Sequence, residues 1–213
     1  YELYPTPVEK DILLLLETGC DILFLPTVNE MYPPAEKLKH YELGEIENIL
    51  EGEYRSGHYQ GVCQIVSKLL ETVTPDNLYL GQKDYQQCMV IKNLTHLEHY
   101  PATINICKTV REESGLALSS RNSRLSSAEK KTASNIYETL LNIKDNIRTG
   151  ELESLKIRMV KKLTEKNFKV DYVAIADATN LSPVNTWDGK QKLVALIAAT
   201  LNEVRLIDNM PLN

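Results

Sequence analysis

Apolar residues in the first half of the chain recur at spacings that predict helices and short strands. From Gly57 to Val73 they fall at i, i+3, i+4, i+7, i+8 and i+11, which places them on one face of a helix. This stripe consists of Val62, Ile65, Val66, Leu69, Leu70 and Val73. Pro75 ends the helix, and short strands at 78–80 and 103–107 flank a second helix over 85–97 that turns Val90, Ile91, Leu94 and Leu97 inward. A strand, turn, helix, strand order predicts two parallel strands of one sheet.

Upstream of this unit the pattern predicts one more helix and one more strand. Val8 to Thr18 has the spacing of a helix, and Gly19 is placed to end it in the left-handed conformation that glycine adopts without strain. The apolar run from Asp21 to Pro26 predicts a short buried strand. Taken together, residues 1–109 predict a parallel sheet covered by helices on both faces, an α/β domain.

After about Val110 the order changes to helices followed by strands. A polar loop, Arg111 to Arg124, precedes Ser126-Ser127-Ala128-Glu129, whose S-x-x-E pattern is a capping box at the start of a helix. That helix turns Ile136, Leu140, Ile143 and Ile147 inward and is expected to end at Gly150.

The remainder of this half predicts a second helix and an antiparallel sheet. The helix covers roughly Leu152 to Asn167, alternation over 170–175 indicates one strand, and residues 192–199 and 203–207 indicate two more. We therefore predict a smaller α+β domain at 110–213.

Composition limits the classes of function. The chain has 213 residues, 43% of them hydrophobic and 25% charged, and a formal net charge of −5. An acidic chain without basic clusters is not built to neutralise many phosphates, so we expect no nucleic-acid partner. The apolar run Ile12 to Leu16 is too short to span a bilayer, and no leader sequence is evident.

The cysteines indicate in which compartment the protein is found, and the first residues indicate that the chain continues upstream. Cys20, Cys63, Cys88 and Cys107 lie far apart without a C-x-x-C pair, which fits a reducing compartment, so we expect a cytoplasmic protein. Tyr1 to Pro7 has the character of a connection, and we expect residues upstream of it.

Gly81-Gln82-Lys83-Asp84 lies where a strand ends and a helix begins, the place where open α/β sheets bind anions. Gly81 would let the backbone approach a phosphate, Lys83 would offset phosphate charge, and Asp84 would orient a ribose hydroxyl or cap the helix. An ordinary turn with a capping Asp84 explains the same residues.

Other segments carry candidate chemistry with equally ordinary alternatives. Leu118-Ser119-Ser120-Arg121-Asn122 offers hydroxyls and a guanidinium suited to triphosphate oxygens, or is a surface loop ahead of a helix cap. Arg55 and His58 would face the same anion, or are an exposed Arg and a helix-start His. Gln86 or Gln87 could hold a hydroxyacid, or is an exposed residue of a first helical turn. His96 and His99 form an H-x-x-H pair without a third ligand, so no metal site is predicted.

Several of these segments, in this order, together resemble pantothenate synthetase. They are Phe24-Leu25-Pro26, Glu30-Met31-Tyr32-Pro33, Leu50-Glu51-Gly52, Arg55-Ser56-Gly57-His58, Gly81-Gln82-Lys83-Asp84-Tyr85-Gln86-Gln87, Thr109-Val110-Arg111-Glu112 and Gly115-Leu116-Ala117-Leu118-Ser119-Ser120-Arg121-Asn122. The resemblance extends over essentially the whole chain.

The resemblance implies a Rossmann-like nucleotidyltransferase fold, a smaller C-terminal domain that closes over ATP, and a homodimer. It implies that ATP, with Mg²⁺, activates pantoate as pantoyl adenylate with release of pyrophosphate, and that β-alanine then displaces AMP. The residues that would contact ATP are Gly81, Gln82, Lys83, Asp84, Val110, Leu118, Ser119, Ser120 and Arg121. Of these, Lys83, Ser119, Ser120 and Arg121 would act in catalysis, Gln87 would hold pantoate, and Arg55 and His58 would be further donors.

The chain departs from the family pattern in two places. Gln82 stands where the family usually has Glu, and the family's His-x-Gly-His motif and first substrate Gln belong to a segment upstream of Tyr1. We therefore expect the segment by itself to lack full activity. Two other functions fit the residues: another adenylating or cytidylyl-transferring enzyme of the same superfamily, and a nucleotide-binding or dimer-forming remnant without turnover.

Overall fold

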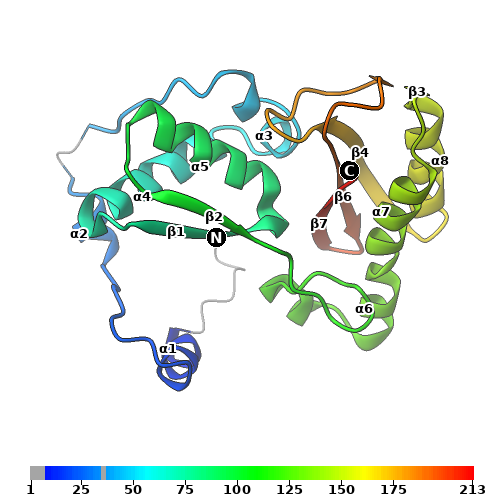
Figure 1. The fold of residues 1–213 in the computed structure, drawn as a ribbon. Coiled ribbons are helices and arrows are strands. Elements are labelled where there is room, and N and C mark those ends of the chain that lie inside the picture. Colours follow the sequence, from blue (N-terminus) through cyan, green and yellow to red (C-terminus); the bar gives the residue numbers. More distant parts are fainter. Residues whose placement is uncertain (1–7, 35–36) are drawn as a thin grey trace. The chain divides into compact units, whose positions relative to one another are not determined.

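The computed structural model describes residues 8–34 and 37–213. The chain divides after Lys39 into two compact units, which are described separately (Figure 1). The first unit contains α1 (Val8–Glu17) and α2 (Val28–Met31). The second contains η1 (Gly44–Glu47), α3 (Glu51–Tyr54), α4 (His58–Val73), β1 (Asn77–Gly81), η2 (Gln82–Asp84), α5 (Tyr85–Leu97), β2 (Thr103–Cys107), η3 (Ser120–Arg124), α6 (Ser127–Ala133), α7 (Asn135–Asn146), β3 (Gly150–Glu151), α8 (Glu153–Thr164), β4 (Phe168–Asp177), β5 (Thr186–Trp187), β6 (Leu193–Leu201) and β7 (Val204–Pro211), where η denotes a 3₁₀ helix.

In the first unit, helix α1 and its glycine stop are confirmed. Gly19 has φ +75°, its N–H donates to the carbonyl of Leu16 at 3.2 Å, and the N–H of Cys20 donates to the carbonyl of Leu15 at 3.0 Å. These two bonds satisfy carbonyls of the last helical turn.

The strand expected at Asp21 to Pro26 is wrong for the residues that the structure describes. This segment is assigned no strand, and Ile22 and Leu25 are 85% and 61% exposed. An apolar run forms a strand only beside a partner that takes up its backbone hydrogen bonds. A capping box between Thr27 and Glu30 then starts α2.

In the second unit, β1, α5 and β2 form the predicted parallel unit. The strands pair from Asn77 with Thr103 to Gly81 with Cys107, and α5 connects them. Helix α5 buries Val90, Ile91 and Leu94 as predicted, whereas Leu97 is 39% exposed and that assignment is wrong. Among the described residues this sheet has two strands, which establishes a mixed α/β fold.

Helix α4 forms where it was predicted, but of the predicted apolar stripe only Leu70 is buried. Tyr59, Cys63, Ser67 and Leu70 are buried, whereas the expected inward residue Val73 is 54% exposed. The rest of the predicted stripe, Val62, Ile65, Val66 and Leu69, is half-buried. The core beneath α4 is formed by Tyr41, Leu43, Tyr59, Cys63, Val90 and Leu94. Aromatic and sulfur side chains, rather than the aliphatic stripe alone, thus fill this interface.

The C-terminal half contains the predicted antiparallel sheet in the order β4, β6, β7. Strand β6 is its centre, and Val194, Ala195 and Ile197 have no exposed surface. Helices α7 and α8 lie beside this sheet (Figure 1) and contribute Leu140, Ile143 and Leu163 to the largest core of the protein. The second helix of this half, predicted at 152–167, is α8.

The capping box at Ser126 and Glu129 is confirmed, but the helix after it is divided. Ser134 ends α6 and begins α7, which stops at Asn146 before the expected end at Gly150. Gly150, at φ +105°, belongs instead to the unpredicted β3–β5 pair. The loop at 111–124, expected to be irregular, contains η3 and a bridge between Arg111 and Ala117.

A third core joins the two halves of the second unit. Cys88 and Met89 of α5 pack with Ala176 of β4 and with Val194 and Leu196 of β6. The end of β1 is therefore held close to the antiparallel sheet, which places the turn after β1 next to β7.

Candidate functional site

The turn after β1 is fixed by an asparagine of β7. Asn209, 2% exposed, donates through Nδ2 to the carbonyls of Gln82 at 2.9 Å and Lys83 at 2.8 Å. The Nε2 of Gln82 donates back to Oδ1 of Asn209 at 3.3 Å. Gln82 therefore helps to hold the turn. The Lys83 side chain extends away from the turn, and its ammonium group has one weak ion-pair partner, Asp84, whose Oδ1 lies 3.8 Å from Nζ.

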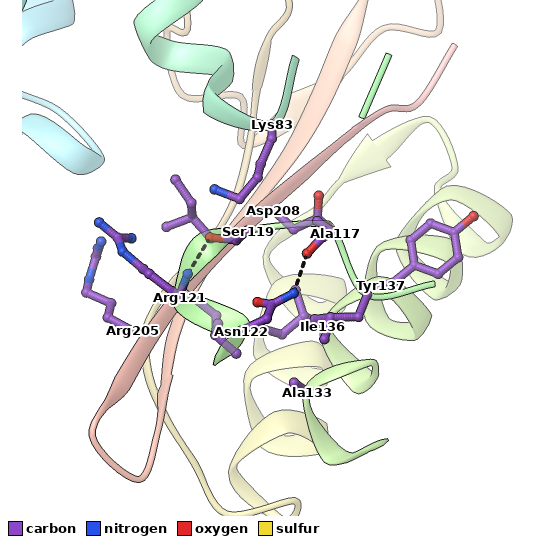
Figure 2. Close-up of a pocket in the computed structure, with 13 residues that line it drawn as sticks. Lys83, Ala117, Ser119, Arg121, Asn122, Ala133, Ile136, Tyr137, Arg205 and Asp208 are labelled. Atoms are coloured by element: carbon purple, nitrogen blue, oxygen red, sulfur yellow. Dashed lines mark hydrogen bonds between the residues drawn. The ribbon is translucent and has the colours of Figure 1, made fainter. Parts of the chain in front are cut away.

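Lys83 reaches a hollow beside η3, which we call the loop hollow (Figure 2). Its walls are formed by Lys83, Leu116, Ala117, Ser119, Arg121, Asn122, Ala133, Ile136, Tyr137, Arg205, Leu206, Ile207 and Asp208. The Ser119 hydroxyl accepts the N–H of Arg121 at 3.2 Å, and Nδ2 of Asn122 donates to the carbonyl of Ala117 at 3.0 Å. These bonds give the Ser119–Asn122 segment a defined conformation. The buried Oδ1 of Asn122 has no donor in the described part of the chain.

A second hollow, which we call the helix hollow, lies at the starts of α4 and α5. Its walls are formed by Glu51, Arg55, His58, Tyr59, Lys83, Asp84, Tyr85, Gln86, Gln87, Tyr172, Leu196, Ile207, Asp208 and Asn209. Lys83, Ile207 and Asp208 border both hollows. Burial, followed by the charge of Arg55, lowers the pKa of His58, so this imidazole is neutral at pH 7.

Two arginines near the hollows are held in ion pairs. Arg111 makes a two-pronged pair with the buried Asp208, at 2.6 and 3.0 Å, and its guanidinium lies 4.2 Å from the ring centre of Tyr137. Arg205 pairs through two nitrogens with Glu51, at 2.7 and 2.8 Å, and through Nε with Asp171 at 2.7 Å. Because their charges are already balanced, these arginines are structural cations.

Burial would raise the pKa of Glu51, but the hydrogen bonds and charge of Arg205, with a bond from the Tyr172 hydroxyl, outweigh it. The pKa of Glu51 is therefore lowered, and the Glu51–Arg205 pair is ionised at neutral pH.

The remaining cations are available to a ligand. Within residues 8–34 and 37–213, neither Arg55 nor Arg121 makes an ion pair, and Lys83 has only its long contact with Asp84. They come from three different segments and border the two adjoining hollows. Cations without a close ion pair on the walls of adjoining hollows suit a polyanion, such as a triphosphate chain.

The structure thus brings together seven residues of the predicted site. Lys83, Ser119 and Arg121 line the loop hollow, and Lys83, Asp84, Gln87, Arg55 and His58 line the helix hollow. The others, Gly81, Gln82, Val110, Leu118 and Ser120, are not on the walls of either. Val110 and Leu118 are 66% and 50% exposed and meet through a bond from the Leu118 N–H to the Val110 carbonyl at 2.9 Å. The roles of all these residues toward ligands stay predictions.

Sequence reasoning missed the residues that build the walls. Asp208 follows the apolar residues Leu206 and Ile207 in strand β7, and a carboxylate at such a position signals a buried ion pair, although the sequence does not name Arg111 as its partner. Gly115, at φ +85°, was quoted in a segment that carries the resemblance, but its structural role was not predicted. A Cβ there would approach Cδ1 of Tyr137 at 2.2 Å, so glycine lets this ring lie against Arg111.

Two kinds of feature are lacking in the described residues. They contain no group of three or more His, Cys, Asp or Glu side chains able to hold a metal ion, and His96 and His99 gain no third ligand. None of their helices has the length and apolar character needed to cross a membrane.

The fold and the two hollows define a mixed α/β protein in which Lys83, Arg121 and Arg55 border adjoining hollows at the end of a parallel strand. Comparison with known proteins gives the family. The Pantoate-beta-alanine ligase family model matches residues 1–211. The chain is 41% identical over 210 residues to pantothenate synthetase of Cytophaga hutchinsonii. This match covers 97% of this chain and 74% of that protein. It is 42% identical over 213 residues to pantoate–β-alanine ligase of Dictyostelium discoideum, covering 96% and 71%.

Solved structures agree with this assignment. The crystal structure of pantothenate synthetase from Thermus thermophilus matches with a TM-score of 0.86 and 35% identity, over 100% of this chain and 77% of that chain. Pantoate–β-alanine ligase from Francisella tularensis, crystallised with β,γ ATP and β-alanine, matches with a TM-score of 0.79 and 36% identity, over 99% and 72%. The chain belongs to the pantoate–β-alanine ligase family.

Proposed function

We propose that this protein catalyses the ATP-dependent condensation of pantoate with β-alanine to pantothenate, through a pantoyl adenylate. The observation that carries the proposal is the gathering of Lys83, Arg121 and Arg55, none of them committed to a close ion pair, around adjoining hollows in a chain of this family. The crystallised Francisella relative, a complex with β,γ ATP and β-alanine, supports the choice of substrates.

In the first step, a carboxylate oxygen of pantoate attacks the α-phosphorus of ATP, and the bond to the leaving pyrophosphate breaks. Negative charge builds up on that pyrophosphate, so Lys83 and Arg121 act most strongly in the transition state. Ser119 and Ser120 donate hydroxyls to phosphate oxygens, and the remaining ATP contacts come from Gly81, Gln82, Asp84, Val110 and Leu118.

In the second step, the amine of β-alanine attacks the acyl carbon of the adenylate and AMP leaves. Gln87, on the first turn of α5, holds pantoate in the helix hollow beside Arg55 and His58.

The described residues fit a magnesium ion that arrives with the triphosphate. Glu51 and Asp208 are committed to arginines, so Asp84, with a side chain 49% exposed, is the carboxylate of the helix hollow that remains accessible. Mg²⁺ typically binds substrate phosphates, one or two carboxylates and several waters. When bound, it would offset charge on the phosphates.

The finer architecture also belongs to this proposal. The β1–α5–β2 unit supports a Rossmann-like first domain at 1–109, and the β4–β6–β7 sheet supports a smaller domain at 110–213 that closes over ATP. The homodimer is what the resemblance implies, and the cytoplasmic location is what the widely spaced cysteines predict.

The test compares this chain with a version extended upstream of Tyr1. It measures pyrophosphate release from ATP with pantoate, with related hydroxyacids in parallel, and ATP binding by calorimetry. Pantoate-dependent release by either version supports the proposal. Release with a different acid would indicate another adenylating enzyme, and ATP binding without release by both versions would indicate a remnant that binds nucleotide. The variant Lys161→Ala is the control, because its side chain is 78% exposed and lies on α8.

A further inference from the structure

The segment Leu50-Glu51-Gly52 has no place in the chemistry proposed above, yet its backbone is tightly constrained. Leu50 has φ +51° and ψ −120°, a conformation that costs energy for any residue with a side chain. A Cβ on Gly52 would lie 2.0 Å from the carbonyl oxygen of Glu47, so only glycine fits. A constrained turn of this kind persists when the surrounding contacts hold it in place.

Those contacts are made by Glu51 and by Gln86, which bonds to its backbone. The N–H of Glu51 donates to Oε1 of the buried Gln86 at 3.0 Å, and Nε2 of Gln86 donates to the carbonyls of Ile46 at 2.7 Å and Ile49 at 2.8 Å. Its carboxylate accepts from Arg205 and from the Tyr172 hydroxyl at 2.9 Å. The turn is thus attached to α5, β4 and β7.

The next residues extend this attachment to the helix hollow. The Tyr54 hydroxyl donates to the carbonyl of Asp171 at 2.9 Å, so both ends of the four-residue helix α3 are bound to the sheet. The ladder between β4 and β6 shifts register between Val170 and Tyr172, and Asp171, at that bulge, bonds Arg205. Arg55 follows α3 directly, and its carbonyl accepts the N–H of His58 at 3.0 Å.

The ion pair forms a wall shared by the two hollows. Glu51 lines the helix hollow and Arg205 lines the loop hollow. Two carboxylates, of Glu51 and Asp171, face one guanidinium, so the cluster carries one net negative charge. Without Arg205, the Glu51 carboxylate on the wall of the helix hollow would face an incoming anion without its counter-charge.

We propose that Glu51 and Arg205 are positioning residues of the adenylation site, an inference that rests on the proposed function. Their ion pair fixes Arg55 and His58 at the helix hollow, and Arg205 keeps the Glu51 carboxylate neutralised beside the anionic nucleotide. Neither residue touches the reacting atoms.

Opposite charge changes at the two residues provide the test. Arg205→Gln changes the net charge of the cluster from −1 to −2, and Glu51→Gln changes it from −1 to 0. Arg205→Gln should raise the KM for ATP about tenfold, whereas Glu51→Gln should leave it unchanged or lower it while kcat falls about tenfold. Arg205→Lys, which restores the charge without the planar fork, should recover the KM and not kcat.

A purely structural pair would give a different result. Equal shifts of KM in the same direction for Glu51→Gln and Arg205→Gln would overturn the inference, as would kinetics like the parent's for both. The exposed pair Lys161 and Glu165 supplies the controls Lys161→Gln and Glu165→Gln, which alter charge on α8 by the same amounts.

Calorimetry with ATP alone separates this inference from the proposed function. If the parent releases no pyrophosphate with pantoate, the proposed function fails. The ATP affinities of the two variants, compared with that of the parent, then decide the inference about Glu51 and Arg205. It stands if Arg205→Gln binds ATP about tenfold more weakly and Glu51→Gln does not. It is overturned if both variants bind ATP like the parent, or if both lose affinity equally, or if the parent itself does not bind ATP.

Discussion

Strand β7 and the turn after β1 are in direct contact, yet their charged side chains differ in how closely they are paired with opposite charges. On β7, Arg205 and Asp208 are balanced by Glu51, Asp171 and Arg111 at 2.6–3.0 Å. On the turn, Lys83 has only Asp84, at 3.8 Å. The same kinds of side chain therefore serve two purposes. The closely paired charges hold the walls in place, and we propose that the loosely paired charge of Lys83 serves a ligand.

The comparison predicts that removing charge from the turn affects rate and hardly affects stability. Lys83→Ala should lower the rate of adenylate formation by about 10² to 10³, because charge develops on the leaving pyrophosphate. Single-turnover pyrophosphate release measures the rate, and urea unfolding measures stability. A rate within a few-fold of the parent's, or a large loss of stability, would mean that Lys83 has a structural role like that of the paired charges of β7. Lys161→Ala is the matched control.

Removing charge from β7 should have the reverse effect. Asp208→Asn leaves Arg111, with a side chain 18% exposed, without its counter-charge, and we expect about 3 kcal/mol less stability. Urea unfolding checks this value against Glu165→Gln, whose carboxylate is 65% exposed and should matter little. A stability loss below about 0.5 kcal/mol for Asp208→Asn would show that the paired charges of β7 contribute no more to stability than exposed charges do.

Gly115 provides a finer test of the β7 wall. Gly115→Ala places a Cβ 2.2 Å from Tyr137 at φ +85°, which should move the ring off Arg111 and cost about 1 to 3 kcal/mol. Thermal unfolding measures the cost. Gly61→Ala on α4, where a Cβ meets no atom within 4 Å, is the control and should be neutral or slightly stabilising. Equal behaviour of the two variants would show that the stacking is not needed.

The smallest expected effect concerns pH. The pKa of His58 is lowered from 6.5, first by burial and then by Arg55, so below pH 6.5 the unfolded chain takes up a proton that the folded chain does not. This contribution to stability is present above pH 6.5 and is lost as pH falls toward the lowered pKa. His58→Gln should flatten the stability profile in that window, as followed by urea unfolding at several pH values. An unchanged profile would contradict the burial of a neutral imidazole.

Local patterns in the sequence were sufficient for much of the fold. The capping box at Ser126, the glycine stop at Gly19, the boundaries of α5 and the parallel pairing of β1 with β2 were all readable, because each depends on neighbouring residues or on one short connection. The segments that carry Lys83, Arg121 and Gln87 were found for the same reason, since a βα turn and a polar loop have local signatures.

Only the tertiary structure decided which residues are partners. Arg205 and Glu51 are 154 residues apart, and Arg111 and Asp208 are 97 apart, so no local pattern pairs them. The buried line of α4 was set by what packs on it, and the run at Asp21 to Pro26 was not a strand, because burial and strand pairing depend on distant segments. The sequence by itself thus determined which charged groups are present near the site. The tertiary structure decided which of them are closely paired and which are not, because the energy of a charge depends on its distance from others and on its removal from water.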